Sequence, residues 1–178
     1  MVRLFVALAL PAQVRERLGL LTGGVPGARW TAVESFHLTL RFIGEVAEHA
    51  AHELALALAA VRAPRFELTL AGVDQFGKGE KSRVLWIGVE RSPALMHLRD
   101  KVESALVRAG LEPDGRKYAP HVTLARLRDT PGARLAAFIQ AYNCVRIGPI
   151  AVDRFVLFSS WQHRDGPTYR EEAEFLLD

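Results

Sequence analysis

The sequence predicts a mixed α/β (α+β) fold in which two lobes, related by a pseudo-twofold axis, enclose a central cleft, with mainly antiparallel sheets and helices outside. The first observation behind this prediction is that the phrase His-x-Thr-Leu occurs twice, at residues 37–40 and 121–124. The second is that both copies lie in the same order of elements: strand, helix, His-x-Thr strand, helix, strand. The third is that hydrophobic residues make up 49% of the 178 positions, enough for a sizeable core.

The first half of the repeat spans about residues 1–76. An apolar run at 3–10 predicts its first strand, and Pro11 suits the first turn of the helix that follows. The apolar face of this helix carries Val14, Leu18 and Leu21 at helical spacing. The remaining elements are a His-x-Thr strand at 36–43, a helix with apolar residues 54, 58 and 61, and a strand at 65–73.

The second half, at about 83–160, repeats this order. After a strand at 83–89, Ser92 and Pro93 suit the N-cap and first turn of a helix, which Gly110 can end. The remaining elements are a His-x-Thr strand at 119–127, a helix with apolar residues 135, 138 and 139, a strand at 147–158 and an extra C-terminal strand at 168–177. We therefore expect residues 1–178 to form a single domain with an internal repeat.

Each His-x-Thr phrase places an imidazole and a hydroxyl on one face of a strand. Side chains alternate along a strand, so His37 and Thr39 share a face, as do His121 and Thr123, with each pair about 7 Å apart. Imidazole transfers protons near neutral pH, and a hydroxyl can hydrogen-bond an anionic oxygen. One copy alone would more often be structural. Two copies facing one cleft would supply an acid, a base and two groups that bind an anion.

Composition limits the partners and the compartment. A net charge of +3 and a pI of about 9.3 favour an anionic partner and do not indicate a long nucleic-acid track. The one cysteine, Cys144, excludes an internal disulfide and fits a reducing cytoplasm, where we expect it to be buried. No apolar run reaches the roughly 18 residues of a membrane span, and we interpret the apolar start of the chain as a strand and not a leader.

Two further motifs resemble sites without completing them. Residues 72–79 nearly match a P-loop, but Gly79 stands where that motif needs Ser or Thr, so we expect a hairpin loop there. His49 and His52, flanked by Glu48 and Glu53, could share a metal on one helix, but no third ligand is evident and a solvated helix face is the better interpretation. We therefore predict no metal site and no cofactor.

With its paired phrases, its opening residues 3–7 and its segment 120–126, the chain resembles the 2H phosphoesterases, specifically the bacterial LigT-like RNA 2',3'-cyclic phosphodiesterases or 2'-5' RNA ligases. The similarity continues through Ser159, Ser160 and the segment 166–169. This resemblance implies a bilobal fold and metal-independent opening of a 2',3'-cyclic phosphate at an RNA end, leaving a 2'-phosphate. It also implies reversible 2'-5' joining of RNA ends. The expected substrates are RNA ends, with tRNA fragments among the candidates, and we expect a monomer.

The two histidines suit that chemistry, because ring opening needs a base for water and an acid for the leaving ribose oxygen. The sequence does not assign the two roles. Thr39 and Thr123 can donate to the non-bridging oxygens. The alternatives are a related 2H enzyme acting on cyclic nucleotides or ADP-ribose cyclic phosphate, and a module that binds RNA ends without turnover. Binding alone would need no pair of proton-transferring groups, which argues against the module.

Substrate contacts beyond the histidines and threonines are less well determined. Strict alternation places Arg41 on the cleft face and Arg126 on the core face, whereas the resemblance favours Arg126. A strand end or a bulge after Leu124 would reconcile the two. Candidates to stack on a base are Phe5, Trp30, Trp86 and Tyr169. Core packing is the simpler interpretation for Phe5 and Trp86, and Tyr169 is the preferred functional candidate.

Overall fold

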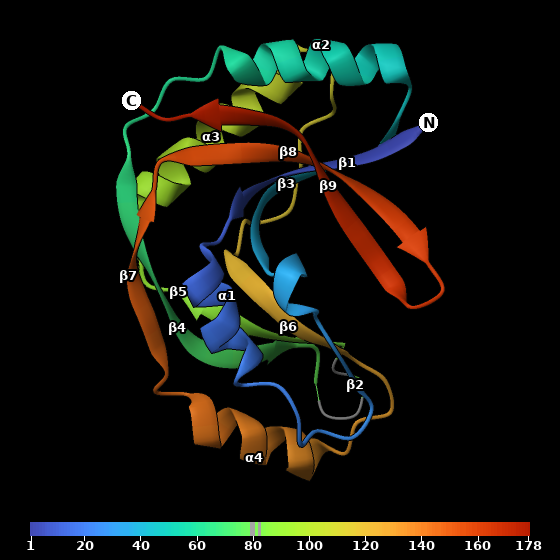
Figure 1. Cartoon of the computed structure of the whole chain (residues 1–178), viewed down its shortest axis with the longest axis vertical. Helices are drawn as coiled ribbons and strands as arrows, with labels where there is room; N and C mark the ends of the chain where they lie inside the picture. Colours follow the sequence, from blue (N-terminus) through green and yellow to red (C-terminus); the bar gives the residue numbers. More distant parts are fainter. Residues whose placement is uncertain (79–80, 82) are drawn as a thin grey trace.

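The computed structural model describes residues 1–78, 81 and 83–178 and shows two antiparallel sheets that face each other (Figure 1). The four-stranded sheet has the order β3 (His37–Val46), β1 (Val2–Ala9), β8 (Arg154–His163) and β9 (Gly166–Leu176). The five-stranded sheet has the order β2 (Ala28–Trp30), β6 (His121–Leu127), β5 (Val84–Val89), β4 (Phe66–Phe76) and β7 (Arg146–Val152). The mixed fold with antiparallel sheets confirms the predicted fold class.

Four α-helices and one 3-10 turn connect the strands within the described residues. They are α1 (Ala12–Gly19), η1 (Val33–Ser35), α2 (Glu48–Ala59), α3 (Pro93–Arg108) and α4 (Gly132–Tyr142). Figure 1 shows α2 and α4 at opposite ends of the molecule, beyond the sheets. Ser92 caps α3 as predicted, because its Oγ accepts a hydrogen bond from the Leu95 N–H at 3.1 Å and Pro93 occupies the first turn.

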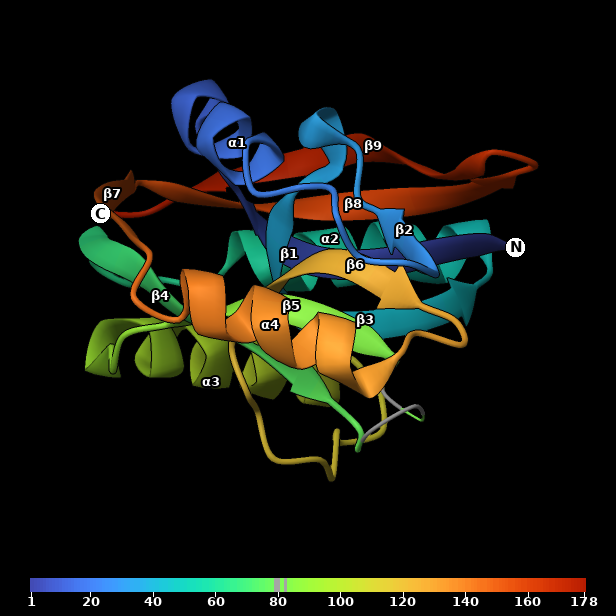
Figure 2. The ribbon, with the colours of Figure 1, turned by 90° about the horizontal axis from the view of Figure 1, so that it is seen from below.

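The third strand of each half lies in the sheet of the other half. Strand β4 pairs with β5 in the five-stranded sheet, and β8 pairs with β1 in the four-stranded sheet (Figure 2). The prediction of one strand at 147–158 is wrong for this reason: β7 and β8 are separate strands that break at Asp153 and belong to different sheets. A continuous apolar run predicts that its residues are buried, but it does not predict to which sheet they belong.

Both His-x-Thr strands carry a bulge at the same place. In β3, Val6 lies opposite Arg41 and Ala7 opposite Thr39, so Leu40 is the extra residue. In β6, Leu85 lies opposite Ala125 and Trp86 opposite Thr123, so Leu124 is the extra residue. Two consecutive residues are therefore buried in each strand, and the residue after them returns to the cleft face. The proposed bulge in β6 is confirmed, and it has a counterpart in β3.

Several smaller expectations concern the surface. His49 and His52 are exposed on α2, which confirms the solvated helix face. Cys144 is exposed, so its predicted burial is wrong. The hairpin predicted around Gly79 involves residues outside the described ones, although β4 and β5 on either side of it are antiparallel neighbours. None of the helices in the described residues is both long enough and apolar enough to cross a membrane.

Candidate active site

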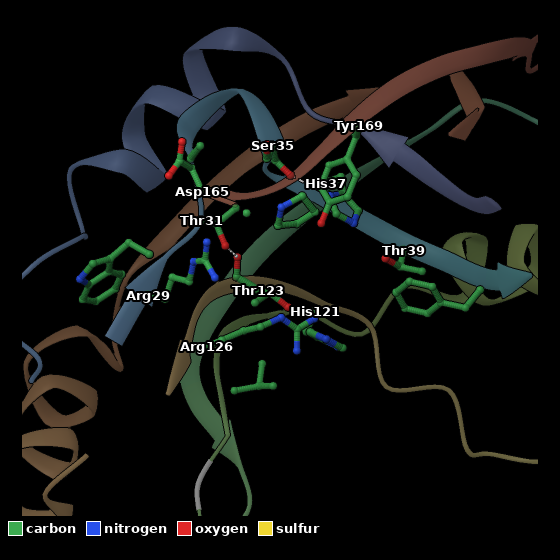
Figure 3. A pocket seen from close by; sticks show the side chains of 16 residues that line it. Arg29, Thr31, Ser35, His37, Thr39, His121, Thr123, Arg126, Asp165 and Tyr169 are labelled. Carbon is green, nitrogen blue, oxygen red and sulfur yellow. Dashed lines mark hydrogen bonds between the residues drawn. The ribbon is translucent and has the colours of Figure 1, made fainter. Parts of the chain in front are cut away.

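One pocket between the two sheets brings the repeated motifs together (Figure 3). Strand β3 contributes His37 and Thr39, and β6 contributes His121 and Thr123. Side chains alternate regularly between the two faces of each strand from the histidine to the threonine. The bulge after each threonine breaks this alternation. We expect the two imidazoles to lie roughly 5 to 8 Å apart, the span of two hydrogen bonds plus a phosphate.

Both imidazoles are held by the same local hydrogen bond. His37 Nδ1 lies 2.8 Å from the Ser35 carbonyl oxygen, and His121 Nδ1 lies 2.7 Å from the Ala119 carbonyl oxygen. A carbonyl oxygen only accepts, so Nδ1 is the protonated nitrogen in each ring. The lone pair of a neutral ring is then on Nε2. A protonated ring carries a proton there, so Nε2 is the atom that can exchange protons with a substrate.

His37 lies in an aromatic environment that favours its neutral form. Its ring centroid is 4.9 Å from that of Phe5 and 5.0 Å from that of Tyr169. Burial lowers the pKa of the imidazole, the hydrogen bond to Ser35 opposes this shift, and the nearby charge of His121 lowers the pKa further. The two imidazoles are therefore close enough to influence each other's protonation.

Each motif threonine is positioned by a hydroxyl from the other half of the repeat. Thr31 Oγ1 donates to the Thr123 carbonyl at 3.0 Å, and the Tyr118 hydroxyl donates to the Thr39 carbonyl at 2.8 Å. Burial raises the pKa of Tyr118, which keeps the phenol protonated as a donor. These bonds use only the main chain of Thr39 and Thr123, so both side-chain hydroxyls remain available to a ligand.

The bulges also decide which arginine reaches the pocket. Arg126 is exposed and lines the pocket, whereas Arg41 is not among the lining residues. The Arg41 side chain is buried, where its Nε donates to Glu103 Oε2 at 2.5 Å and its Nη2 to the Glu112 carbonyl at 2.5 Å. The expectation that Arg41 faces the cleft is wrong, because the extra residue Leu40 shifts the alternation by one.

Of the four aromatic candidates, two line the pocket and two do not. Tyr169 and Trp30 line the pocket. Phe5 is only 2% exposed and packs beneath His37, so its assignment as a substrate contact is wrong, while its interpretation as core is confirmed. Trp86 does not line the pocket, and its ring lies 6.1 Å from that of His121. Tyr169 contacts His37 edge-on, and burial raises the pKa of its hydroxyl despite the charge of Arg126.

The sequence analysis missed several pocket residues, among them Arg29, Phe42 and Asp165. Phe42 had a detectable signal, because it follows His37 by five positions as Arg126 follows His121. Arg29 and Asp165 had none, since their places depend on the pairing of β2 with β6 and on the β8–β9 hairpin.

Comparisons with known proteins agree with this arrangement. A family model described as the 2'-5' RNA ligase superfamily matches residues 25–160. A protein of Aeropyrum pernix named RNA 2',3'-cyclic phosphodiesterase is 39% identical over 161 residues, covering 88% of this chain and 89% of its own length. A protein of the same name from Thermotoga maritima is 33% identical over 175 residues, covering 94% of this chain and 91% of its own.

A solved structure shares the fold over almost the whole chain. The crystal structure of E. coli LigT complexed with 3'-AMP superposes with a TM-score of 0.77 at 32% identity, covering 99% of this chain and 98% of that one. The bilobal arrangement described above is therefore the fold of an experimentally known protein.

Proposed function

Because the chain belongs to the 2'-5' RNA ligase superfamily, we propose that it is an RNA 2',3'-cyclic phosphodiesterase that hydrolyses a terminal 2',3'-cyclic phosphate to a 2'-phosphate. The observation that carries this proposal is the pairing of two imidazoles, each held through Nδ1, with two threonine side chains in one pocket. The names of the relatives support the same substrate class.

We propose that His37 and His121 are the catalytic residues. One neutral imidazole takes a proton from water as the water oxygen bonds to phosphorus. The other, protonated imidazole gives its proton to the ribose O3' as the bond between phosphorus and O3' breaks. The two imidazoles end with exchanged protonation states, and exchange with solvent restores them. When a ribose 5'-hydroxyl replaces the water, its oxygen bonds to phosphorus as the bond to O3' breaks, and the same two proton transfers form a 2'-5' linkage, so the proposal extends to 2'-5' joining of RNA ends.

Thr39 and Thr123 are assigned to the non-bridging oxygens of the reacting phosphate. Their hydroxyls can donate to these oxygens as negative charge redistributes in the transition state. Arg126 adds a guanidinium to the same pocket, and Tyr169 and Trp30 offer ring faces to a terminal base. Together these residues supply proton transfer and charge neutralisation from side chains alone.

The direct test uses purified protein and RNA that ends in a 2',3'-cyclic phosphate, with and without EDTA. We expect ring opening at an unchanged rate in EDTA, because the proposed acid, base and phosphate contacts are all side chains. The product should carry its phosphate on the 2' oxygen. This position can be determined with enzymes that distinguish a 2'-phosphate from a 3'-phosphate. A rate abolished by EDTA and restored by a divalent ion would contradict the mechanism. An RNA that binds but stays intact would favour the binding module.

The pH dependence of kcat/KM should be bell-shaped, because turnover needs one neutral and one protonated imidazole. The limbs belong to the coupled pair and not to one residue each. Burial lowers the pKa of His37 below its ordinary 6.5, so the pair keeps one neutral member as the pH falls below that value. The acid limb should therefore lie below pH 6.5, and activity should fall there as the pair gains its second proton. An acid limb above pH 6.5 would contradict the role of burial.

We further propose a monomeric cytoplasmic enzyme whose substrates include the ends of tRNA fragments. Both His-x-Thr motifs, which supply the proposed acid and base, lie in one chain, and the exposed thiol of Cys144 suits a reducing compartment. Sedimentation of the purified protein tests the monomer, and a dimer at assay concentrations would contradict it.

A further inference from the structure

We infer that Arg29, together with Arg126, forms a second phosphate-binding position that takes the 5'-side phosphate of the terminal nucleotide. The inference rests on the proposed function and deepens it, since it names the substrate class. The enzyme should prefer an RNA 3' end that carries at least one further phosphate over a mononucleoside 2',3'-cyclic phosphate.

The first support is the register of β2 against β6. Arg29 lies directly opposite Arg126 in this antiparallel pair, so both side chains project from one face of the sheet. Like charges that face each other across two strands repel and destabilise the pair. Both arginines line the pocket, and neither forms an ion pair among residues 1–78, 81 and 83–178. An anion shared between the two guanidinium groups would relieve the repulsion.

The second support is the charge balance of the pocket. A 2',3'-cyclic phosphate is a monoanion with two non-bridging oxygens, and the hydroxyls of Thr39 and Thr123 are already assigned to them. One imidazole is protonated in the active form, which balances the single negative charge. Within the described residues, Asp165 is the one acidic side chain in the lining, so Arg29 and Arg126 leave an excess positive charge. A second phosphate would neutralise that excess.

The third support is the position of the Arg29 guanidinium. A Cβ added to Gly166 would lie 3.1 Å from Arg29 Nη2, so the backbone at the β8–β9 turn packs against the guanidinium. Gly166 has a φ of +124°, which a side chain would also disfavour. The hairpin of one sheet therefore holds an arginine of the other beside the motif residues (Figure 3). A planar guanidinium held in this way suits a phosphate, to which it can donate two parallel hydrogen bonds.

The second phosphate must then belong to the nucleotide being processed. The reacting phosphate bridges O2' and O3' of the terminal ribose, and the nearest other phosphate along an RNA chain is esterified to O5' of that ribose. A mononucleoside cyclic phosphate lacks this group. A 5'-phosphorylated form of the same nucleotide carries it without any preceding nucleoside, which separates a phosphate contact from base stacking.

The experiment measures kcat/KM on three substrates: adenosine 2',3'-cyclic phosphate, its 5'-phosphorylated form, and a dinucleotide ending in the same cyclic phosphate. We expect the wild-type enzyme to favour both phosphate-bearing substrates by about tenfold, the scale of one charge-assisted hydrogen-bonded contact. The preference should decrease with added salt, because each phosphate contact on a single strand adds about 0.7 to the slope of log affinity against log salt.

Two variants and one control assign the preference to Arg29. Arg29→Ala should bring the ratio of kcat/KM between the phosphorylated and unphosphorylated mononucleotides close to one, mainly through KM. Arg29→Gln, which keeps a polar hydrogen-bonding side chain but removes the charge, should do the same, and Arg29→Lys should retain part of the ratio as a point charge. Arg108→Ala is the matched control, because Arg108 is exposed at the end of α3 and the variant changes the net charge equally.

The outcomes separate this inference from the proposed function. No turnover of any of the three substrates by the wild-type enzyme would overturn the proposed function and the inference together. Turnover of all three with equal kcat/KM would overturn the inference alone. A wild-type preference that survives in both Arg29→Ala and Arg29→Gln would also overturn it, because the contact would then lie elsewhere. Loss of the preference in these variants and not in Arg108→Ala is the supporting result.

Discussion

Replacing His37 or His121 by alanine is expected to reduce turnover of an RNA 2',3'-cyclic phosphate by roughly 10² to 10⁴, the contribution typical of a general acid or base. Each variant leaves one imidazole to serve both steps, although the two steps need opposite protonation states. Single-turnover kinetics on the same cyclic phosphate substrate measure the loss at the chemical step. Near-normal activity in either single variant would remove that histidine from the mechanism.

The double variant and a surface control sharpen this test. The loss of turnover in the double variant, His37→Ala with His121→Ala, should be far smaller than the product of the two single losses. The effects of residues that act as a unit are not additive. His97→Ala should leave turnover unchanged, since His97 is exposed on α3 and lies outside the pocket. Circular dichroism should show that the two single variants and the double variant remain folded, because both motif histidines face the pocket.

Removing the hydroxyl of either motif threonine should give the next largest loss. Thr39→Val or Thr123→Val is expected to lower kcat by roughly 10² to 10³, the cost of one donor to a developing oxyanion. Valine keeps the branched shape, so the strand and its packing are preserved. The loss should appear in kcat more than in KM, because the hydrogen bond strengthens in the transition state.

The serine variants are the matched controls for this second result. Thr39→Ser and Thr123→Ser retain the hydroxyl and should keep most of the activity. Equal losses in the serine and valine variants would show that the methyl group and not the hydroxyl matters, which would contradict the assignment to phosphate oxygens. The Thr31 and Tyr118 hydrogen bonds reach the main chain at these positions and are retained in every one of these variants.

Much of this fold was predictable from local patterns. Two apolar strands with His-x-Thr, the helices between them and the Ser92 cap depend on interactions within a few residues, which sequence periodicity records directly. The internal repeat places the two motifs at equivalent positions in the two halves. A pseudo-twofold relation between the halves then predicts that the two motif strands face one cleft. The pairing of His37 with His121 in one pocket needed no further information.

The less predictable part concerns register and pairing between distant segments. Alternation places Arg41 in the cleft, and only the bulge at Leu40 buries it against Glu103. The same kind of bulge at Leu124 turns Arg126 toward the pocket. A bulge inserts one extra residue into a strand and leaves no distinct side-chain pattern in the sequence. Its two consecutive buried residues look like any other neighbours in an apolar run.

The sequence by itself thus determined the catalytic candidates, because their chemistry and spacing lie within single strands. Only the tertiary structure decided which sheet each third strand joins, since the run at 147–158 divides between β7 and β8. It also decided that Arg29 of β2 faces Arg126 of β6 beside Gly166 of the β8–β9 turn. These three residues come from segments far apart in the chain. Their proximity depends on hydrogen bonding and packing between strands, which no local pattern encodes.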